Sequence, residues 1–391
     1  MIVKSTATPY VCAQCLVRQE SRRLYSSAPL SPPPPPPPPS GAAKLTNRRL
    51  ISLHGEETPK FLQGIITNNL RSESRSGLYA AFLTAPGKVL HDVFIYPSLG
   101  SQWHRDTNKD DNHGYLVEVD ADQVQSLLTH LKKHKLRSKF KLRVVEEGEL
   151  DVWSVWREDD RWTAHTQGSP EDGTVGLIDC RASGMGQRLL LPQASAGPGL
   201  PAQLETDEAP LSAYTIRRYL RGVPEGQNEI PWNEALPMNH NIDIMGGIDF
   251  KKGCYIGQEL TIRTHHTGVV RRRILPIQLY SHSSQPPEKL LYSPDAVPDA
   301  DALEHNVEIR RDDERKRSTG RLIASTGNIG LGMCRLEQMS ELVVSGEGSS
   351  FSPDDRFLVQ TSQDGQVGIK AFVPDWMRGR IREPKLQRRV E

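Results

Sequence analysis

The sequence predicts an α+β protein whose C-terminal part is mainly β, and three observations lead to this prediction. Strand-like and helix-like patterns alternate between residues 49 and 146. Short strands and one helix follow between residues 151 and 221. From residue 319 onward, short strands and glycine turns dominate, which is typical of a small β-barrel or sandwich.

Length and composition set the outer limits. The 391 residues can hold two or three compact domains. The net charge is +1 with 25% charged residues, so the chain lacks the strong basic character expected of a nucleic-acid or membrane-surface binder. No apolar run approaches the roughly 18 residues that cross a bilayer, so we expect no membrane span.

The N-terminal elements follow from local patterns. Residues 49–54 predict a strand, and Thr58-Pro59 begins a helix with a cap residue and a proline at the first helical position. A polar loop is expected at 98–114. Val124, Leu127, Leu128 and Leu131 recur at helical spacing after Asp120, a capping residue. The other elements expected up to residue 221 are strands at 79–84, 88–97, 115–119, 140–146, 151–156, 174–179 and 187–191, and helices at 121–134 and 211–221, the second ending at Gly222.

The C-terminal part changes character. Residues 263–280 alternate as a strand does, and residues 281–318 are rich in proline and then in charge, which predicts an exposed insertion. We therefore expect an α+β domain at 46–262 and a C-terminal β-barrel domain at 263–391.

The N-terminus has the composition of a mitochondrial transit peptide. Residues 1–19 contain no acid, and basic and hydroxyl residues are frequent up to "RRLYSS". We expect a transit peptide at 1–25, a mature chain beginning near Ser26, and a location in the mitochondrial matrix. Residues 26–45 are predicted to be a proline-rich linker, with Pro32–Pro39 a stiff polyproline II spacer.

One cysteine lies in an unusual setting, "KKGCYIGQELTIRTHH" at residues 251–266. The chain has five cysteines, and Cys12 and Cys15 lie in the predicted leader. Cys254 follows two lysines, which would favour a thiolate, and Gly253 and Gly257 leave it uncrowded. The residues alone leave two interpretations open, a functional thiol or a small buried apolar side chain. The spacing to His265 and His266 matches no closed zinc site. A single thiolate cannot enclose an iron–sulfur cluster without ligands from a partner protein or a small-molecule thiol.

The stretch "KGCYIGQELTIRTHHTGVVRRR" closely resembles the signature of the YgfZ-type iron–sulfur assembly factors, which share the fold of the aminomethyltransferase of glycine cleavage. "FLQGIITNNL", "DCRASGMGQRLLLP", "YTIRRYLRGVPEG" and "STGNIGLGMCRL" occur in the family's order, over most of residues 46–380. The family's motif cysteine corresponds to Cys254. Its flanking residues correspond to Lys252, Gly253, Tyr255, Gly257, Gln258, Glu259 and Arg263.

The resemblance implies a GcvT/YgfZ-like folate-binding fold with a C-terminal β-barrel and a mitochondrial, fungal family member. It implies a factor that helps to mature [4Fe–4S] proteins with an A-type carrier and has no turnover reaction of its own. Cys254 would be the functional thiol and a shared ligand of a transient [2Fe–2S] or [4Fe–4S] cluster. One departure is Asn239, which stands where the family commonly has glutamate.

The alternative function is a tetrahydrofolate-dependent, aminomethyltransferase-like enzyme, because the fold implies a cleft for a folate-like molecule. Its acid–base candidate is Asp92, which is expected to share a face of strand 88–97 with Leu90, Phe94 and Tyr96 and to have a raised pKa. The competing interpretation is an edge-strand aspartate in contact with water. Arg218 and Arg263 are candidates for binding the glutamate tail of folate.

Overall fold

The computed structural model describes residues 32–70, 76–107, 113–158, 174–192, 206–294, 296–297, 303–313, 317–345, 348–361 and 365–381. The predicted transit peptide lies outside the described residues. Contacts divide the chain into two units, residues 1–33 and 34–391, and the second carries every element named below.

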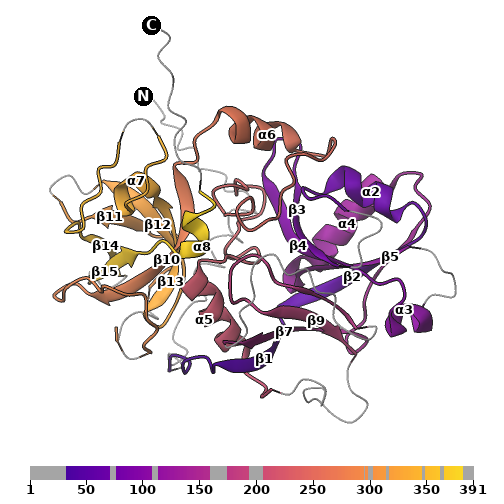
Figure 1. Cartoon of the computed structure of the whole chain (residues 1–391), viewed down its shortest axis with the longest axis horizontal. Helices are drawn as coiled ribbons and strands as arrows, with labels where there is room; N and C mark the ends of the chain where they lie inside the picture. Colours follow the sequence, from indigo (N-terminus) through magenta and orange to yellow (C-terminus); the bar gives the residue numbers. More distant parts are fainter. Residues whose placement is uncertain are drawn as a thin grey trace, which may run out of the picture. The chain divides into compact units, whose positions relative to one another are not determined.

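A five-stranded antiparallel sheet forms the first layer (Figure 1). One face packs on two helices, α2 (Thr58–Ile65) and α4 (Val124–Lys135), whose apolar stripes meet the sheet in one core cluster. A short helix, α3 (Gln102–Thr107), and a 3₁₀ turn, η1 (Ala121–Gln123), complete this layer. In spatial order the strands are β3 (Leu78–Leu83), β4 (Val89–Pro97), β5 (Gly114–Asp120), β2 (Arg48–His54) and β6 (Lys141–Val144).

Three local expectations in this layer need correction. The loop expected at 98–114 contains α3, whose start is stabilised by the Ser101 hydroxyl, which accepts the N–H of His104 at 3.1 Å. Helix α2 begins at Thr58 itself, with Glu57 as a cap that makes no side-chain bond. Leu90 does not share a face with Phe94 and Tyr96, because a β-bulge at this point of β4 moves it into the core beneath the helices.

A four-stranded antiparallel sheet packs on the opposite face of the first. Tyr79 and Phe94 from the five-stranded sheet meet Val152, Trp156 and Leu190 from the other in a shared core. The strands in spatial order are β1 (Ser40–Lys44), β7 (Asp151–Arg157), β9 (Gln187–Leu191) and β8 (Val175–Ile178).

The N-terminal strand of this sheet comes from the segment predicted to be a linker. Residues 40–44 pair with β7 along their whole length. The Pro38 carbonyl accepts the indole N–H of Trp156 at 3.0 Å, and the Pro39 carbonyl accepts the N–H of Glu158 at 2.8 Å. The proline run therefore contacts the fold, because its carbonyls remain free to accept hydrogen bonds although proline has no N–H.

The C-terminal strands close into a barrel, as predicted. Its two short helices are α7 (Leu336–Met339) and α8 (Asp375–Arg378). Around the barrel the strands are β10 (Arg272–Ser281), β13 (Ile329–Arg335), β12 (Ser318–Thr326), β11 (Glu308–Arg311), β14 (Phe357–Gln360) and β15 (Gln366–Ala371), which pairs again with β10.

Two expectations about the C-terminal part also change. Residues 263–267 continue helix α6 (Gln258–Thr267), and strand β10 begins only at Arg272. The segment predicted to be an exposed insertion, 281–318, contains β11 and places Ile309 and Leu303 in the barrel core. A four-residue strand beside a run of charges shows too little alternation to be found from the sequence.

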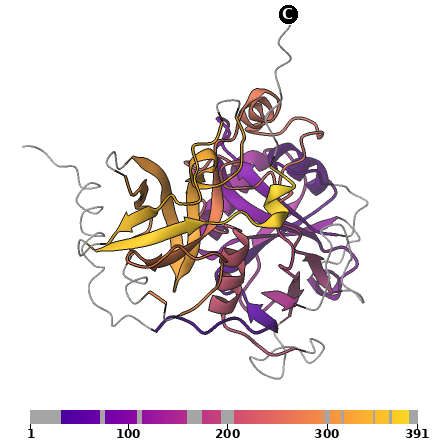
Figure 2. The ribbon, with the colours of Figure 1, turned by 60° about the vertical axis from the view of Figure 1, so that its left-hand side comes forward.

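Helix α5 (Leu211–Arg221) joins the sandwich to the barrel (Figure 2). Ala213 and Tyr214 belong to the core between the two sheets, whereas Ile216 and Tyr219 pack against barrel residues. Its C-terminal carbonyl, at Arg221, accepts the indole N–H of Trp376 at 3.0 Å. None of the helices in the described part of the chain has the length and apolar composition needed to cross a bilayer.

We predict that replacing Gly222 by alanine destabilises the protein by about 1–3 kcal/mol. Gly222 caps α5 at φ +68°, and an added Cβ would lie 2.6 Å from Pro276 and 2.7 Å from Met377. The control is Gly64→Ala in α2, where an added Cβ meets nothing within 4 Å and should stabilise the helix by up to ~1 kcal/mol. Urea unfolding of both variants measures this. Equal effects of the two substitutions would contradict the close approach at Gly222.

Candidate functional site

The Cys254 thiol lies on the loop that precedes helix α6, and its side chain is exposed. A Cβ added to the neighbouring Gly253 would meet no atom within 4 Å, so the approach to the sulfur is open on that side. The expected exposure of this thiol is confirmed. Cys180 is also exposed, whereas Cys334 is fully buried in β13, where burial raises the pKa of its thiol to about 12.

The Lys252 ammonium binds backbone carbonyls near the end of α2 and does not serve as a cation beside the thiol. It donates to the carbonyls of Gln63 at 2.8 Å, Ile66 at 2.7 Å and Asn68 at 2.8 Å, at and beyond the C-terminal end of α2. Burial lowers the pKa of Lys252 to about 8, so the amine is still mainly charged at neutral pH. Three N–H donors meeting three carbonyls leave none for a ligand. Lys252 thus anchors the loop that carries Cys254.

The residues after the thiol build a tight turn. Gly257 has φ +82°, and an added Cβ would lie 2.3 Å from the Thr84 carbonyl, so only glycine fits against the β3–β4 hairpin. The Gln258 side chain accepts the backbone N–H of Tyr255 at 2.9 Å and closes the turn. Tyr255 itself is buried in the core between the sheets.

Glu259 and Arg263 differ from the turn residues because their side chains face solvent. Both are exposed on α6, with Glu259 in its first turn, where the helix dipole favours an acid. The motif therefore separates into residues that hold the loop and residues that are presented to solvent, namely Cys254, Glu259 and Arg263.

Asp92 lies on β4, an internal strand of the five-stranded sheet, and is fully buried. The edge-strand interpretation is therefore wrong. Its carboxylate accepts the Gly226 N–H at 3.1 Å and lies 3.5 Å from the Arg48 guanidinium. Burial raises the pKa of Asp92 by more than Arg48 lowers it, so the expected direction is confirmed.

Asp92 belongs to a buried ionic network that ties the two sheets to the loop after α5. Glu118 on β5 accepts from Arg48 at 2.7 Å and from Arg188 on β9 at 2.9 Å, which bridges the sheets. Arg188 also donates to Glu225 at 2.6 Å. The members are Arg48, Arg181, Arg188 and Arg218 with Asp92, Glu118, Asp179, Glu225 and Glu229.

The charges of this network act in opposite directions on the pKa values of Asp92 and Glu225. Four guanidiniums face five carboxyls, so the network has one more acidic group than basic groups. Burial alone would raise the pKa of Glu225, but Arg188, Arg181 and Arg48 hold it well below its usual range. The pKa of Glu225 is therefore lowered and that of Asp92 raised, so these two carboxyls of the network hold a proton with different strength.

Of the two arginines predicted to bind folate, Arg218 is already bound to other groups of the protein. Arg218 is buried, makes a two-point contact with Glu229 at 2.7 and 2.9 Å, and also donates to the Val223 carbonyl. Asp92 has no exposed surface. Arg263 is on the exposed surface of α6, apart from this buried network. We derive no step through folate from this arrangement.

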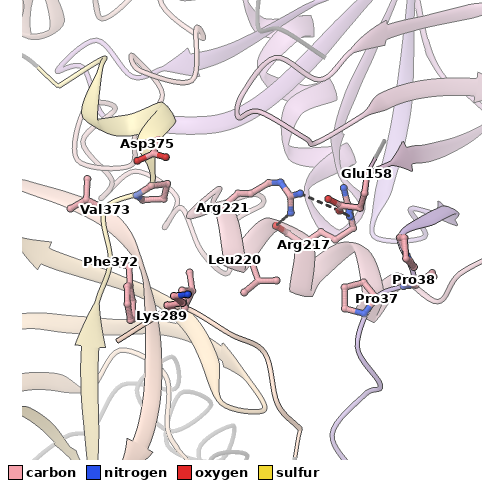
Figure 3. Close-up of a pocket in the computed structure, with 13 residues that line it drawn as sticks. Pro37, Pro38, Glu158, Arg217, Leu220, Arg221, Lys289, Phe372, Val373 and Asp375 are labelled. Carbon is pink, nitrogen blue, oxygen red and sulfur yellow. Dashed lines mark hydrogen bonds and ion pairs between the residues drawn. The ribbon is translucent and has the colours of Figure 1, made fainter. Parts of the chain in front are cut away.

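A pocket of about 850 Å³ lies between α5, the proline run and the barrel (Figure 3). Two of its cations share one anion, because Arg217 and Arg221 both contact Glu158. Arg217 also donates to the Gly184 carbonyl at 2.6 Å, and Arg221 to the Ser183 carbonyl at 3.0 Å. These pairs fix the end of α5, and Lys289 also lines the pocket.

Sequence reasoning missed the network apart from Asp92 and Arg218. A signal was present in "DCRASGMGQRLLLP", where Arg188 precedes three leucines in a short strand. Its carboxylate partners are 70 and 37 positions away in the chain, and pairing at such separations cannot be read from local spacing. For metals, no group of three or more His, Cys, Asp or Glu side chains that could hold an ion occurs among the described residues.

Comparisons with known proteins agree with this architecture. The family model described as "CAF17, C-terminal beta-barrel domain" matches residues 271–379. Among solved structures, the chain is similar to the aminomethyltransferase T of the glycine cleavage system from Bartonella henselae. The TM-score is 0.58 at 11% identity, covering 86% of each chain, and this similarity concerns the fold alone.

Relatives in fungi are much more similar. The chain is 44% identical to a protein of Aspergillus fumigatus named "Iron-sulfur cluster assembly factor IBA57 homolog, mitochondrial", with 96% of this chain and 91% of that protein covered. Proteins of the same name from Pyricularia oryzae and Neurospora crassa are 45% and 39% identical, over 94% and 96% of this chain and 92% and 90% of theirs.

We predict that Lys252→Met costs about 2–4 kcal/mol of stability, because three carbonyls lose a charged donor. Lys251→Met is the matched control, since Lys251 is exposed and should change stability by less than ~0.5 kcal/mol. Urea unfolding gives the free energies, and limited proteolysis reports opening of the 251–257 loop. A Lys252→Met protein as stable as the control would contradict the anchoring role.

Glu225→Gln should cost about 3–5 kcal/mol, because it leaves buried guanidiniums without their anion, whereas Asp92→Asn should cost about 1 kcal/mol at neutral pH. The folded pKa of Asp92 lies above its unfolded value, so the advantage of wild type over Asp92→Asn is largest below about pH 4 and shrinks toward its neutral-pH value as the pH rises through the folded pKa. Urea unfolding of wild type and variant between pH 4 and 7 tests the sign. An advantage of wild type that grows with pH would show that Asp92 is the ionised partner of Arg48.

Proposed function

The chain belongs to the family of mitochondrial iron–sulfur cluster assembly factors represented by IBA57, and on this premise we propose that it supports the maturation of [4Fe–4S] proteins with Cys254 as its functional thiol. The observation that carries this proposal is that some residues of the motif hold the loop in place while another is exposed to solvent. Lys252, Gly257 and Gln258 hold the loop, while the thiol is exposed.

The thiol supports a role as a ligand supplied to a cluster that another protein carries. A thiolate is a soft ligand for iron, and clusters generally take four protein ligands, mostly thiolates. No group of three or more metal-binding side chains lies together in the described part of the chain. We infer that Cys254 contributes one ligand to a [2Fe–2S] or [4Fe–4S] cluster, which is cargo, and that an A-type carrier contributes the others.

Ligand exchange is the elementary step in this proposal. The Cys254 sulfur donates an electron pair to iron and its proton leaves to solvent, while a displaced thiolate of the carrier takes up a proton. No electron is transferred in the exchange itself. The anchored loop contributes by limiting the orientations of the thiol before the carrier arrives, which lowers the entropy lost on binding.

A transferase reaction on folate is not part of this proposal. The fold is that of an aminomethyltransferase, but fold does not determine chemistry. Asp92 and Arg218, the residues that would serve such a reaction, are committed to the buried network. A glycine-dependent methylene-transfer assay on the purified chain would reveal the activity if it existed. We further propose the mitochondrial matrix as the location, from the acid-free basic leader.

Cys254→Ser should fold like wild type and fail in function, because serine keeps the size of the side chain and loses the soft ligand. In a strain that carries only this variant, aconitase and lipoate-dependent activities should fall, while [2Fe–2S] proteins are spared. Cys180→Ser, at the other exposed cysteine, is the control and should retain function.

In vitro, anaerobic reconstitution of the mature chain with an A-type carrier should give a complex that elutes together with cluster absorbance, and Cys254→Ser should give none. A Cys254→Ala strain with normal [4Fe–4S] enzymes would identify the protein as a scaffold in which this thiol is structural.

A further inference from the structure

A second cavity, of about 320 Å³, lies where the barrel meets the loop of residues 231–240. The start of β10, the start of β12 and the end of β13 form one wall, and Lys88 of the β3–β4 hairpin lies on the other side. Four cations line it, Lys88, Arg272, Arg321 and Arg335, against the single carboxylate of Glu234. We call this cavity the arginine pocket.

The three arginines share one face of the barrel wall. Arg272 and Arg335 are direct partners in the β10–β13 register. Arg321 is opposite Met333 in the β12–β13 register, and Met333 and Arg335 point to the same face because side chains alternate along a strand. Like charges directly opposite each other destabilise a sheet, so this arrangement carries an energetic penalty in the chain by itself.

Within the described part of the chain, these guanidiniums lack the carboxylate counter-ions that Arg273, Arg217 and Arg221 have. Arg272, Arg321 and Arg335 make no side-chain hydrogen bond, ion pair or ring contact with any residue that the structure describes. By contrast, the adjacent Arg273 contacts both oxygens of Asp243 at 2.8 Å, and Arg217 and Arg221 share Glu158 in the pocket of Figure 3.

The other lining groups add hydrogen-bonding capacity with little negative charge. Lys88 donates to the backbone carbonyl of Glu234 at 3.2 Å. His240 is buried, and burial lowers its pKa to about 4, so it is neutral at physiological pH. Asn239 also lines the pocket. A glutamate at this position would add a second carboxylate to the wall, and the amide avoids that.

We propose that the arginine pocket binds a small molecule that carries two or more carboxylate or phosphate groups. The planar guanidinium fork matches both kinds of oxyanion with paired hydrogen bonds. The volume is at the lower end of the range for small-molecule sites, and three strands, a loop and a hairpin line a pocket that is open to solvent. This inference does not depend on the proposed function.

The pocket is adjacent to the hairpin that supports the Cys254 loop. Lys88 follows Gly87, and a Cβ added to Gly87 would lie 3.0 Å from the Gly257 carbonyl and 2.9 Å from Leu260 of α6. An anion that orders Lys88 therefore acts one residue away from the turn on which the thiol loop rests.

The test is calorimetric titration of the full mature chain with citrate and, separately, with pyrophosphate, at an ionic strength held constant with potassium chloride. We expect saturable one-to-one binding of at least one of these probes. The preferred probe identifies the ligand as a polycarboxylate or a phosphate compound. Arg272→Gln, Arg335→Gln and Asn239→Glu should each weaken that binding by about tenfold or more. The control is Arg310→Gln, an exposed arginine paired with Glu308 outside the pocket, which should bind as wild type does.

A second measurement separates loss of binding from loss of folding. Without an added anion at low ionic strength, Arg335→Gln should raise the thermal midpoint, because it relieves the repulsion from Arg272. At one fixed concentration, the preferred probe should raise the midpoint of wild type by more than that of Arg335→Gln. The proposal is overturned if neither probe binds saturably to wild type, or if the pocket variants bind as tightly as the Arg310→Gln control.

Discussion

The bridge from Glu118 to Arg188 and on to Glu225 is the interaction on which the rest of the structure depends. It crosses the interior between two antiparallel sheets and joins them to the loop that leaves α5. Apolar packing between the sheets would tolerate small shifts of one against the other, whereas paired guanidinium–carboxylate bonds fix one relative position. A buried pair of this kind contributes little net stability compared with apolar residues of the same volume, and its better-supported effect is to make the packing unique.

The network also supports our proposal that a fold shared with a folate enzyme serves a different function here. The place where an acid–base residue would be needed holds Asp92, and the surrounding arginines already have carboxylate partners. In our proposal the functional group lies instead on the loop before α6. There the motif uses a lysine, a glycine and a glutamine for structure and presents a single sulfur. Most of the motif residues around Cys254 that resemble the family signature thus have a structural role, because they hold the loop in place.

Much of the fold follows from local pattern, and the failures have physical causes. Strands β2, β5, β7 and β9 and helices α4 and α5 show clear periodicity or capping and lie where the sequence predicts them. Strands β1 and β11 were not predicted because proline and charged residues dominate the sequence around them. The bulge at Leu90 turns this side chain to the opposite face of an otherwise regular strand. At the site, the exposed thiol was predictable from its glycine neighbours. The destination of the Lys252 ammonium was not, because its acceptors lie more than 180 positions away.

The pairing of β1 has a consequence for the order in which the protein can fold. The first strand of the sandwich pairs with residues 153–157, and at its other edge Ala42 donates a backbone hydrogen bond to residue 207 and accepts one from residue 209. A chain that emerges from a ribosome or a translocation pore with its N-terminus first must therefore keep β1 unpaired until more than 100 further residues have followed. Over that interval the strand's free edge is open to wrong partners. The prolines that precede it cannot donate backbone hydrogen bonds, so on that side they restrict the extension of any such pairing.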